Sequence, residues 1–193
     1  MRQIIKKCHE FNTELHNIFI DYKHAFGSVF RDKIIECLNK YEIPSKLIKL
    51  IARTLQDTKA RVKVYQNYTE KFEIMTGVKQ GDPLSAALFS IVIDNILKQL
   101  ELRSSISTRL KQCSAYADDI LITAQNEQTM IDTFKKLKSI SLQFGLIVNK
   151  NKTKYMKETQ VNTLTVDNKH TDQVTSFSYV GTIVNGNNTG RRN

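Results

Sequence analysis

The sequence contains no Trp, only 2 Pro, 7 Gly and 3 Cys among its 193 residues. So few Pro and Gly residues exclude collagen-like and Pro-rich chains. The three cysteines, Cys8, Cys37 and Cys113, have no CxxC spacing, so neither a disulfide framework nor a zinc site is predicted. No apolar run approaches the roughly 18 residues of a membrane helix, and the charged start lacks the apolar core of a secretory signal. The sequence therefore predicts a soluble intracellular chain that does not span a membrane.

Positive charge is in surplus, because 29 Lys and Arg outnumber 19 Asp and Glu, which gives a formal net charge of +10. This surplus suggests a polyanionic partner. Half of it lies in residues 46–63, which hold six basic residues and a single acidic one. As a helix, this segment places Lys46, Lys49 and Arg53 opposite an apolar stripe. The stripe consists of Leu47, Ile48, Ile51 and Leu55. The basic side is either a solvated face or a ridge that follows a phosphate backbone and makes binding salt-dependent.

Hydrophobic periodicity and turn residues outline the secondary structure. Residues 2–11 are predicted to be the end of an amphipathic helix. Further helices are predicted at 31–41 and 45–57, from Asp82-Pro83 to about 100, and from Asn126 to Gly145. Strands are predicted at 15–21, 109–116, 120–124, 152–157, 160–166 and 177–184, with a hairpin at 61–75 that turns at Gln66-Asn67 and a frayed tail. This order favours an α+β fold, an antiparallel sheet with helices packed on one face.

Three carboxylates lie at the ends of predicted strands. They are either ordinary turn residues or members of a catalytic site. Asp21 ends an apolar strand, and Asp118 and Asp119 lie between two apolar strands. Asp is common in turns because its side chain bonds nearby backbone. Carboxylates gathered at the ends of central strands, however, repel one another unless cations lie between them. Hard divalent ions such as Mg²⁺ meet that requirement, and a pair of them can promote an in-line phosphoryl displacement.

Five segments, in order, resemble the core motifs of reverse transcriptases, most closely those of non-LTR (LINE-type) retrotransposons. They are FIDYKHAFGSV (19–29), TGVKQGDPLSAALFSIVID (76–94), AYADDILI (115–122), GLIVNKNKTKYM (145–156) and FSYVGTIV (177–184). YADD alone would be weak evidence, whereas the ordered set is specific and covers most of the chain. The resemblance implies a polymerase palm, related to the RRM and ferredoxin-like sheets, at about 11–29 and 76–184. It also implies a partial fingers insertion at about 30–75 and leaves 185–193 as the tail.

The resemblance assigns catalytic and metal-binding roles. Asp21 and Asp118 would be the main metal ligands and Asp119 a more peripheral one, with the backbone carbonyl of Tyr22 as an additional ligand. The cofactor implied is a pair of Mg²⁺ ions, with Mn²⁺ as a substitute. Lys152 matches the lysine of an N-x-x-K-T motif that begins at Asn149, and it would protonate the departing pyrophosphate. Without the motif, Lys152 would be one of several solvated lysines.

The resemblance also assigns substrate contacts. Phe26 matches a steric gate against the ribose 2′-hydroxyl, although it could equally be a core Phe. Gln80 and Gly81 precede a helix N-terminus and would line the nucleotide and template pocket, unless they are a plain loop. Tyr116 would lie near the primer terminus. The primer grip would comprise Phe177, Tyr179 and Gly181.

The family pattern is not fully matched. Relatives read A-F-D where this chain has Ala25-Phe26-Gly27, so a carboxylate is missing beside the site and Gly27 is expected to loosen the backbone. Upstream fingers segments, a thumb, an endonuclease and a zinc-binding cluster are not expected in these 193 residues. The sequence thus predicts an RNA-directed DNA polymerase core that uses an RNA template, a DNA primer and dNTPs. The alternatives are a silent remnant that binds nucleic acid weakly, and an RRM-like binding module that lacks the usual aromatic RNA-binding stretch.

Overall fold

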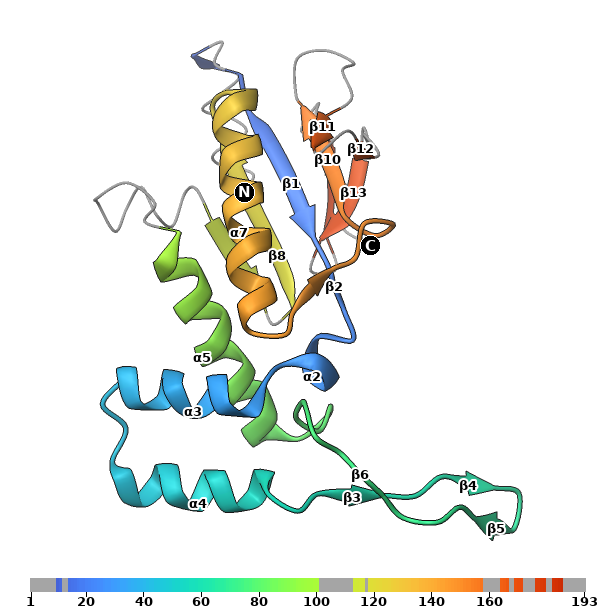
Figure 1. Ribbon diagram of the computed structural model, residues 1–193. Coiled ribbons are helices and arrows are strands. Elements are labelled where there is room, and N and C mark those ends of the chain that lie inside the picture. The colour runs from blue at the N-terminus through green and yellow to red at the C-terminus, as the bar shows by residue number, and fades with distance from the viewer. Residues whose placement is uncertain are drawn as a thin grey trace.

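The computed structural model describes residues 10–11, 14–100, 113–116, 118–157, 164–166, 169–171, 176–179 and 182–185. A four-stranded antiparallel sheet in the order β10-β1-β8-β7 forms its centre (Figure 1). The strands are β1 (His16–Ile20), β7 (Cys113–Tyr116), β8 (Asp119–Ala124) and β10 (Lys154–Lys157). Because β1 is antiparallel to both β8 and β10, its last residues lie beside the first residues of both neighbours.

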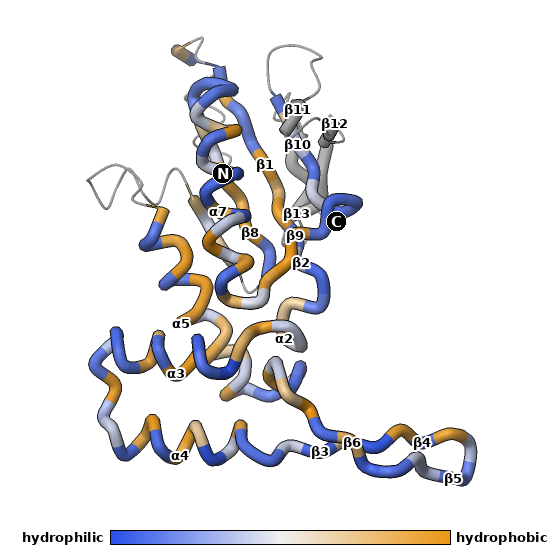
Figure 2. Tube along the Cα trace, viewed as in Figure 1, coloured by the Kyte–Doolittle hydropathy of each residue, from blue (hydrophilic) through white to orange (hydrophobic). Residues whose placement is uncertain are grey.

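Two long helices pack with the sheet to form the main core. They are α5 (Pro83–Gln99) and α7 (Glu127–Gln143). Helix α7 lies across β1 and β8, and α5 contacts both α7 and α3 (Figure 1). Ile18, Ile122 and Tyr155 are paired across the sheet and join these helices in one buried cluster. Phe19 and Leu121 alternate to the opposite face and are buried as well. The apolar character of β1, β8 and α5 in Figure 2 reflects this burial.

The starts of both long helices follow from their capping residues. The Asp82 side chain accepts a hydrogen bond from the Ser85 N–H at 3.3 Å, and the Asn126 side chain accepts one from the Thr129 N–H at 2.8 Å. Helix α7 ends before Gly145, whose φ of +82° is favourable only for glycine. These caps confirm the predicted boundaries.

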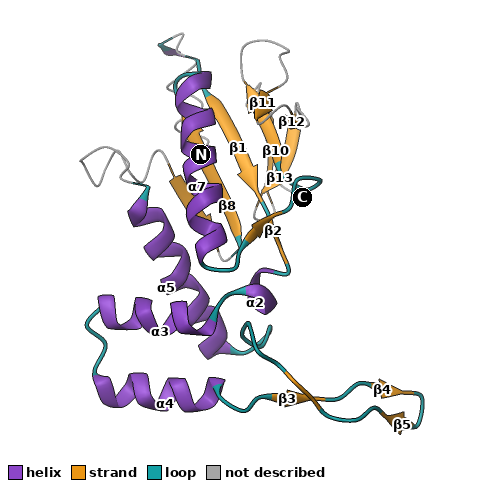
Figure 3. Ribbon diagram, in the orientation of Figure 1, coloured by secondary structure: helices purple, strands orange, loops and turns teal. Residues whose placement is uncertain are grey.

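A second group of elements connects β1 to α5. The helices are α2 (Ala25–Ser28), α3 (Arg31–Lys40) and α4 (Ser45–Leu55). A two-stranded arm, residues 59–73, follows with β3 (Lys59–Ala60), β4 (Lys63–Val64), β5 (Asn67–Tyr68) and β6 (Phe72–Glu73). The arm extends away from the helices (Figure 3), and its residues 61–73 are all exposed. It confirms the predicted hairpin. The turn lies one residue earlier than predicted, at Tyr65-Gln66, because Val64 pairs with Asn67 and Tyr65 takes a positive φ of 54°.

Helix α4 differs from its predicted pattern. Ile48 is buried and Ile51 is partly buried, but Leu47 is 50% exposed. The predicted four-residue apolar stripe is therefore wrong at Leu47. Helix α4 packs mainly against α3, and a single neighbouring helix covers only a narrow strip of its surface.

The remaining strands form two-stranded sheets. They are β2 (Tyr22–Lys23) with β9 (Ile147–Val148), β11 (Leu164–Val166) with β12 (Lys169–Thr171), and β13 (Ser176–Tyr179) with β14 (Thr182–Asn185). The single strand predicted at 177–184 is wrong, because β13 and β14 pair as separate antiparallel strands. Residues 2–9, 109–112, 160–163 and 186–193, on which other predictions fall, lie outside the described residues. No helix in the described part of the chain is long and apolar enough to cross a membrane.

Candidate active site

Three acidic residues meet at one end of the central sheet because of the register between β1 and β8. Ile20 pairs with Ile120, so Asp21, which follows β1, lies beside Asp119, which begins β8. Asp118 occupies the turn immediately before Asp119. Asp21 and Asp119 also line a cavity of about 330 Å³. The structure thus brings together the carboxylates that were predicted to act together.

The charge balance at this site is negative. Burial raises the pKa of the Asp119 carboxyl above its ordinary value, and the charges of Asp118 and Asp21 raise it further. The ammonium group of Lys152 lowers the same pKa, but its effect is smaller than that of burial or of either carboxylate. Neighbouring carboxylates make the ionised form of Asp119 costly, and a cation between them would relieve that cost.

Asp21 is contacted by two residues from the loop that precedes β10. The Asn149 side-chain amide donates a hydrogen bond to Asp21 Oδ2 at 3.1 Å, and the Asn149 backbone N–H donates one to the Asp21 carbonyl at 2.8 Å. Lys152 Nζ lies 3.9 Å from Asp21 Oδ1, and Lys152 lines the same cavity. The sequence indicated Asn149 only as the start of a motif, and its contact with Asp21 was not predicted. The motif spacing places Asn149 three residues before Lys152 but gives no signal of the contact with Asp21.

The donor atoms at the site suit a hard cation. Carboxylate and carbonyl oxygens are the ligands that Mg²⁺ prefers. The Tyr22 hydroxyl is hydrogen-bonded to Ser141 Oγ at 2.6 Å, and burial raises the pKa of Tyr22 to about 12, so only its backbone carbonyl suits a ligand role. As the described side chains stand, no group of three His, Cys, Asp or Glu residues could by itself hold a metal ion. The chemical type of the donors fits the predicted cofactor, and the ligand set stays a prediction.

Phe26 lies on α2, a few residues after Asp21. Its ring stacks on that of Phe89 from α5, with 4.6 Å between ring centroids and 24° between ring planes. Phe89 is completely buried, whereas Phe26 is partly exposed. The Phe26 carbonyl accepts a hydrogen bond from the Val78 N–H at 2.7 Å. The ring and the backbone of Phe26 are therefore both held in place. The sequence did not indicate Phe89 as the partner, because it is one of many apolar residues in α5.

The segment around Gly27 is held firmly, although Gly27 was expected to loosen it. The Thr76 hydroxyl donates to the Gly27 carbonyl at 3.1 Å, and the Gly77 N–H donates to the Val29 carbonyl at 2.8 Å. A Cβ added to Gly27 would meet no atom within 4 Å. There is therefore open space at position 27, where the family motif that this segment resembles has a carboxylate.

The other residues that were predicted to contact substrate lie in the loop before α5 and at the turn between β7 and β8. Gln80 and Gly81 are exposed in the loop before α5, and Gly81 has a φ of +87°, which favours glycine. The hydrogen bond from Val78 to Phe26 ties this loop to the α2 segment. Tyr116 pairs with Asp119 at the turn between β7 and β8.

The predicted nucleic-acid contacts do not lie together at the carboxylates. Lys46, Lys49 and Arg53 are exposed on α4, which lies beyond α3 from the sheet (Figure 1). Phe177 and Tyr179 belong to β13. Gly181 lies outside the described residues. The roles of all these residues stay predictions.

Comparison with known proteins places this site in a family. The family model "Reverse transcriptase (RNA-dependent DNA polymerase)" matches residues 1–184. The Pol polyprotein of a type-1 retrotransposable element R2 from Bradysia coprophila is 29% identical over 153 residues, which are 78% of this chain and 18% of that protein. The type-2 R2DM counterpart from Drosophila melanogaster is 27% identical over 154 residues, 77% of this chain and 14% of that protein. The chain therefore spans less than a fifth of the length of these two relatives.

Solved structures show the same arrangement of elements. Telomerase from Candida tropicalis, in complex with a TWJ fragment of telomeric RNA, superposes with a TM-score of 0.73 at 14% identity. The match covers 100% of this chain and 33% of the telomerase chain. The apo telomerase of the same species gives a TM-score of 0.73 at 15% identity and covers 99% of this chain and 34% of that one. These likenesses confirm the predicted α+β palm-type fold.

Proposed function

The chain belongs to the reverse transcriptase (RNA-dependent DNA polymerase) family, and from this premise we propose that it carries the catalytic core for DNA synthesis on an RNA template. The reaction would be attack of a DNA primer 3′-hydroxyl on the α-phosphate of a dNTP, with pyrophosphate as the leaving group. The observation that carries the proposal is the convergence of Asp21, Asp118 and Asp119 at the end of two central strands, beside Lys152 and a cavity.

The carboxylates define the cation requirement. Asp21, Asp118, Asp119 and the Tyr22 carbonyl would hold two Mg²⁺ ions, or Mn²⁺ in their place. When bound, such ions would lower the pKa of the attacking hydroxyl and neutralise negative charge on the phosphate. The raised pKa of Asp119 supports this assignment, because it arises partly from the other two carboxylates. The contribution of the protein is then to orient its carboxylates and to position the substrates.

Lys152 would act at the leaving group. Its side chain is 70% exposed and extends along the cavity wall near Asp21, so its ammonium can approach a triphosphate held there. A lysine ammonium can donate a proton to the departing pyrophosphate as a general acid. Phe26 would contact the sugar of the same dNTP, and Gln80 with Gly81 the base and the template strand.

Primer extension tests this proposal directly. We expect the chain to extend a DNA primer on an RNA template with Mg²⁺ and dNTPs, and the Asp118→Asn variant to lose the activity. Asp132→Asn is the matched control, because Asp132 is exposed on α7 and accepts a hydrogen bond from Gln128 within the same helix. Extension at background level by the wild-type chain would reject the activity and favour the silent remnant that binds nucleic acid weakly.

A further inference from the structure

Asn149 is hydrogen-bonded both to Asp21 and to the backbone of Lys152, two residues to which the proposed function assigns roles. It follows β9, which pairs with β2, so the loop after β9 lies beside the residue that follows β1. The Asn149 backbone N–H extends this pairing to the Asp21 carbonyl. Its own carbonyl accepts hydrogen bonds from the N–H groups of Lys152 at 3.3 Å and Thr153 at 2.9 Å. The position of Asn149 is therefore fixed by backbone bonds on both sides, independently of its side chain.

The side chain of Asn149 adds a contact that the backbone does not need. Its amide donates to Asp21 Oδ2, while Asp21 Oδ1 lies on the side of Lys152. The final torsion of an Asp side chain is broad, so a carboxylate without a fixed donor rotates readily. A donor on one oxygen selects one orientation and leaves the other oxygen toward the cavity. The Asp21 carboxylate is 24% exposed, so few water molecules can replace that donor.

An amide is well suited to this position. It donates a hydrogen bond but carries no charge, so it orients a carboxylate without neutralising it. A Lys or Arg at the same place would form an ion pair with Asp21 and compete with a bound cation. A second carboxylate would add to the repulsion that already raises the pKa of Asp119.

We infer that Asn149 is a positioning residue, whose side-chain amide holds the Asp21 carboxylate in the orientation that accepts a divalent cation. The inference rests on the proposed function, because it takes Asp21 as a cation ligand. It goes further in assigning a role to a residue that contacts Asp21 and does not itself line the cavity. Groups that orient a ligand in this way typically change metal affinity about 10- to 100-fold when they are removed.

Mn²⁺ binding to the full chain tests the inference without requiring turnover. Free Mn²⁺ is measured by electron paramagnetic resonance in a titration without nucleotide or nucleic acid. Asn149→Leu keeps the branched shape of the side chain and the backbone bonds but removes the donor. We expect about 10-fold weaker binding in this variant, a loss of the same binding in Asp21→Asn, and partial recovery in Asn149→Gln, which retains an amide.

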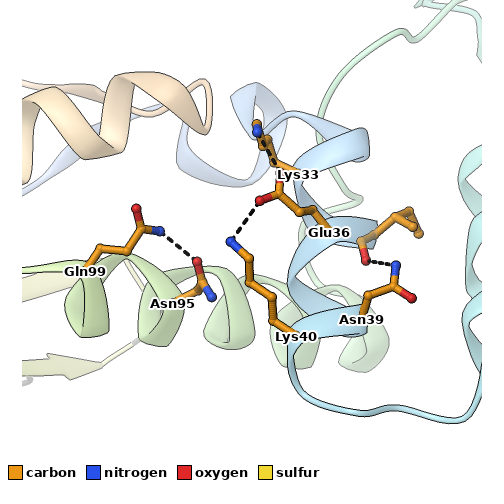
Figure 4. Close-up of polar contacts among 7 residues, drawn as sticks. Lys33, Glu36, Asn39, Lys40, Asn95 and Gln99 are labelled. Atoms are coloured by element: carbon orange, nitrogen blue, oxygen red, sulfur yellow. Dashed lines mark hydrogen bonds and ion pairs between the residues drawn. The ribbon is translucent and has the colours of Figure 1, made fainter.

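Controls separate positioning from folding. Asn39→Leu makes the same substitution on the exposed surface of α3, where the Asn39 amide donates to the Ile35 carbonyl (Figure 4), and should leave Mn²⁺ affinity unchanged. Circular dichroism should show that Asn149→Leu retains the wild-type spectrum. Wild-type affinity in the Asn149→Leu variant would overturn the inference, as would wild-type binding that does not depend on Asp21. If Asn149-dependent binding is found but primer extension is not, the inference stands and the proposed polymerase activity fails.

Discussion

The ring of Phe26 stacks on the ring of Phe89 at a centroid distance of 4.6 Å, which joins the segment after Asp21 to helix α5. Because Phe89 is completely buried, it cannot move without disturbing the core. The exposed part of Phe26 is therefore presented by a rigid support. A steric gate requires this rigidity, since a ring that could swing aside would admit the 2′-hydroxyl of a ribonucleotide.

We predict that Phe26→Val increases ribonucleotide incorporation relative to deoxyribonucleotide incorporation. Phe89→Leu should shift the ratio in the same direction but less, because the Phe26 ring is retained and only its support is weakened. The measurement is the ratio of kcat/KM for a ribonucleotide and its deoxy counterpart in single-nucleotide extension. Leu88→Ile on the same buried helix controls for general loosening of α5. Unchanged sugar discrimination in Phe26→Val would remove the gate role.

The basic residues of α4 differ from those of α3 in their partners. On α3, Lys33 and Lys40 both bind the Glu36 carboxylate, at 2.6 and 2.8 Å (Figure 4). On α4, no ion pair joins Lys46, Lys49 or Arg53 to an acidic group within the part of the chain that the structure describes. Their charge is therefore available to an external polyanion, although exposure alone does not show binding.

Replacing Lys46, Lys49 and Arg53 together with Ala should weaken binding to single-stranded RNA and flatten its salt dependence. Each lost phosphate contact lowers the slope of log K against log salt by about 0.7 for a single strand. Fluorescence anisotropy at several salt concentrations measures that slope. The control removes the same charge from Lys33, Lys40 and Lys98, which are paired with Glu36 and Asp94. If both triple variants show the same slope, the α4 face is merely solvated.

Local signals in the sequence predicted most of the fold, and long-range relationships account for what was missed. Helix α7 begins and ends where Asn126 and Gly145 indicate, because caps act within a few residues. The antiparallel pairing that brings Asp21 to Asp119 was predictable only through the motifs. The contact between Asn149 and Asp21 spans 128 positions, and no local pattern encodes it. The exposure of Leu47 was missed for a similar reason, because periodicity cannot show how many neighbours a helix has.

A buried histidine at the other end of β1 predicts a pH dependence of stability. His16 is inaccessible to solvent, and its Nδ1 lies 2.6 Å from the Tyr155 hydroxyl. Burial lowers the pKa of His16 below 6.5, although the neighbouring Glu14 opposes this shift and Lys157 adds to it. Glu127 is the other charged group that acts on the ring, and it also raises the pKa. The folded state therefore binds protons at this site less readily than the unfolded state.

The free energy of unfolding should consequently fall as the pH drops below 6.5 toward the lowered pKa of His16. One such group contributes a slope of at most about 1.4 kcal/mol per pH unit. Urea denaturation at pH 7.5 and 5.5 measures the change. His16→Asn should reduce the difference between the two pH values, whatever its effect on absolute stability. His24→Asn, at an exposed position, should leave the difference intact; an equal pH response in His16→Asn and the wild-type chain would contradict the assignment.

Gly27 and Gly77 touch one another but have opposite tolerances for a side chain. A Cβ at Gly77 would lie 2.3 Å from the Gly27 carbonyl oxygen, and Gly77 has a φ of +77°. Gly27 is helical, and a Cβ added to it would meet open space.

We predict that Gly77→Ala lowers the free energy of unfolding by more than the roughly 1–2 kcal/mol that the left-handed conformation costs, because the two backbone segments must also separate. Gly27→Ala should be neutral or stabilising by up to about 1 kcal/mol, since Ala is favoured within helices. Denaturant titration of the two variants measures both values. Equal losses in the two variants would contradict the close approach of Gly77 to the Gly27 backbone.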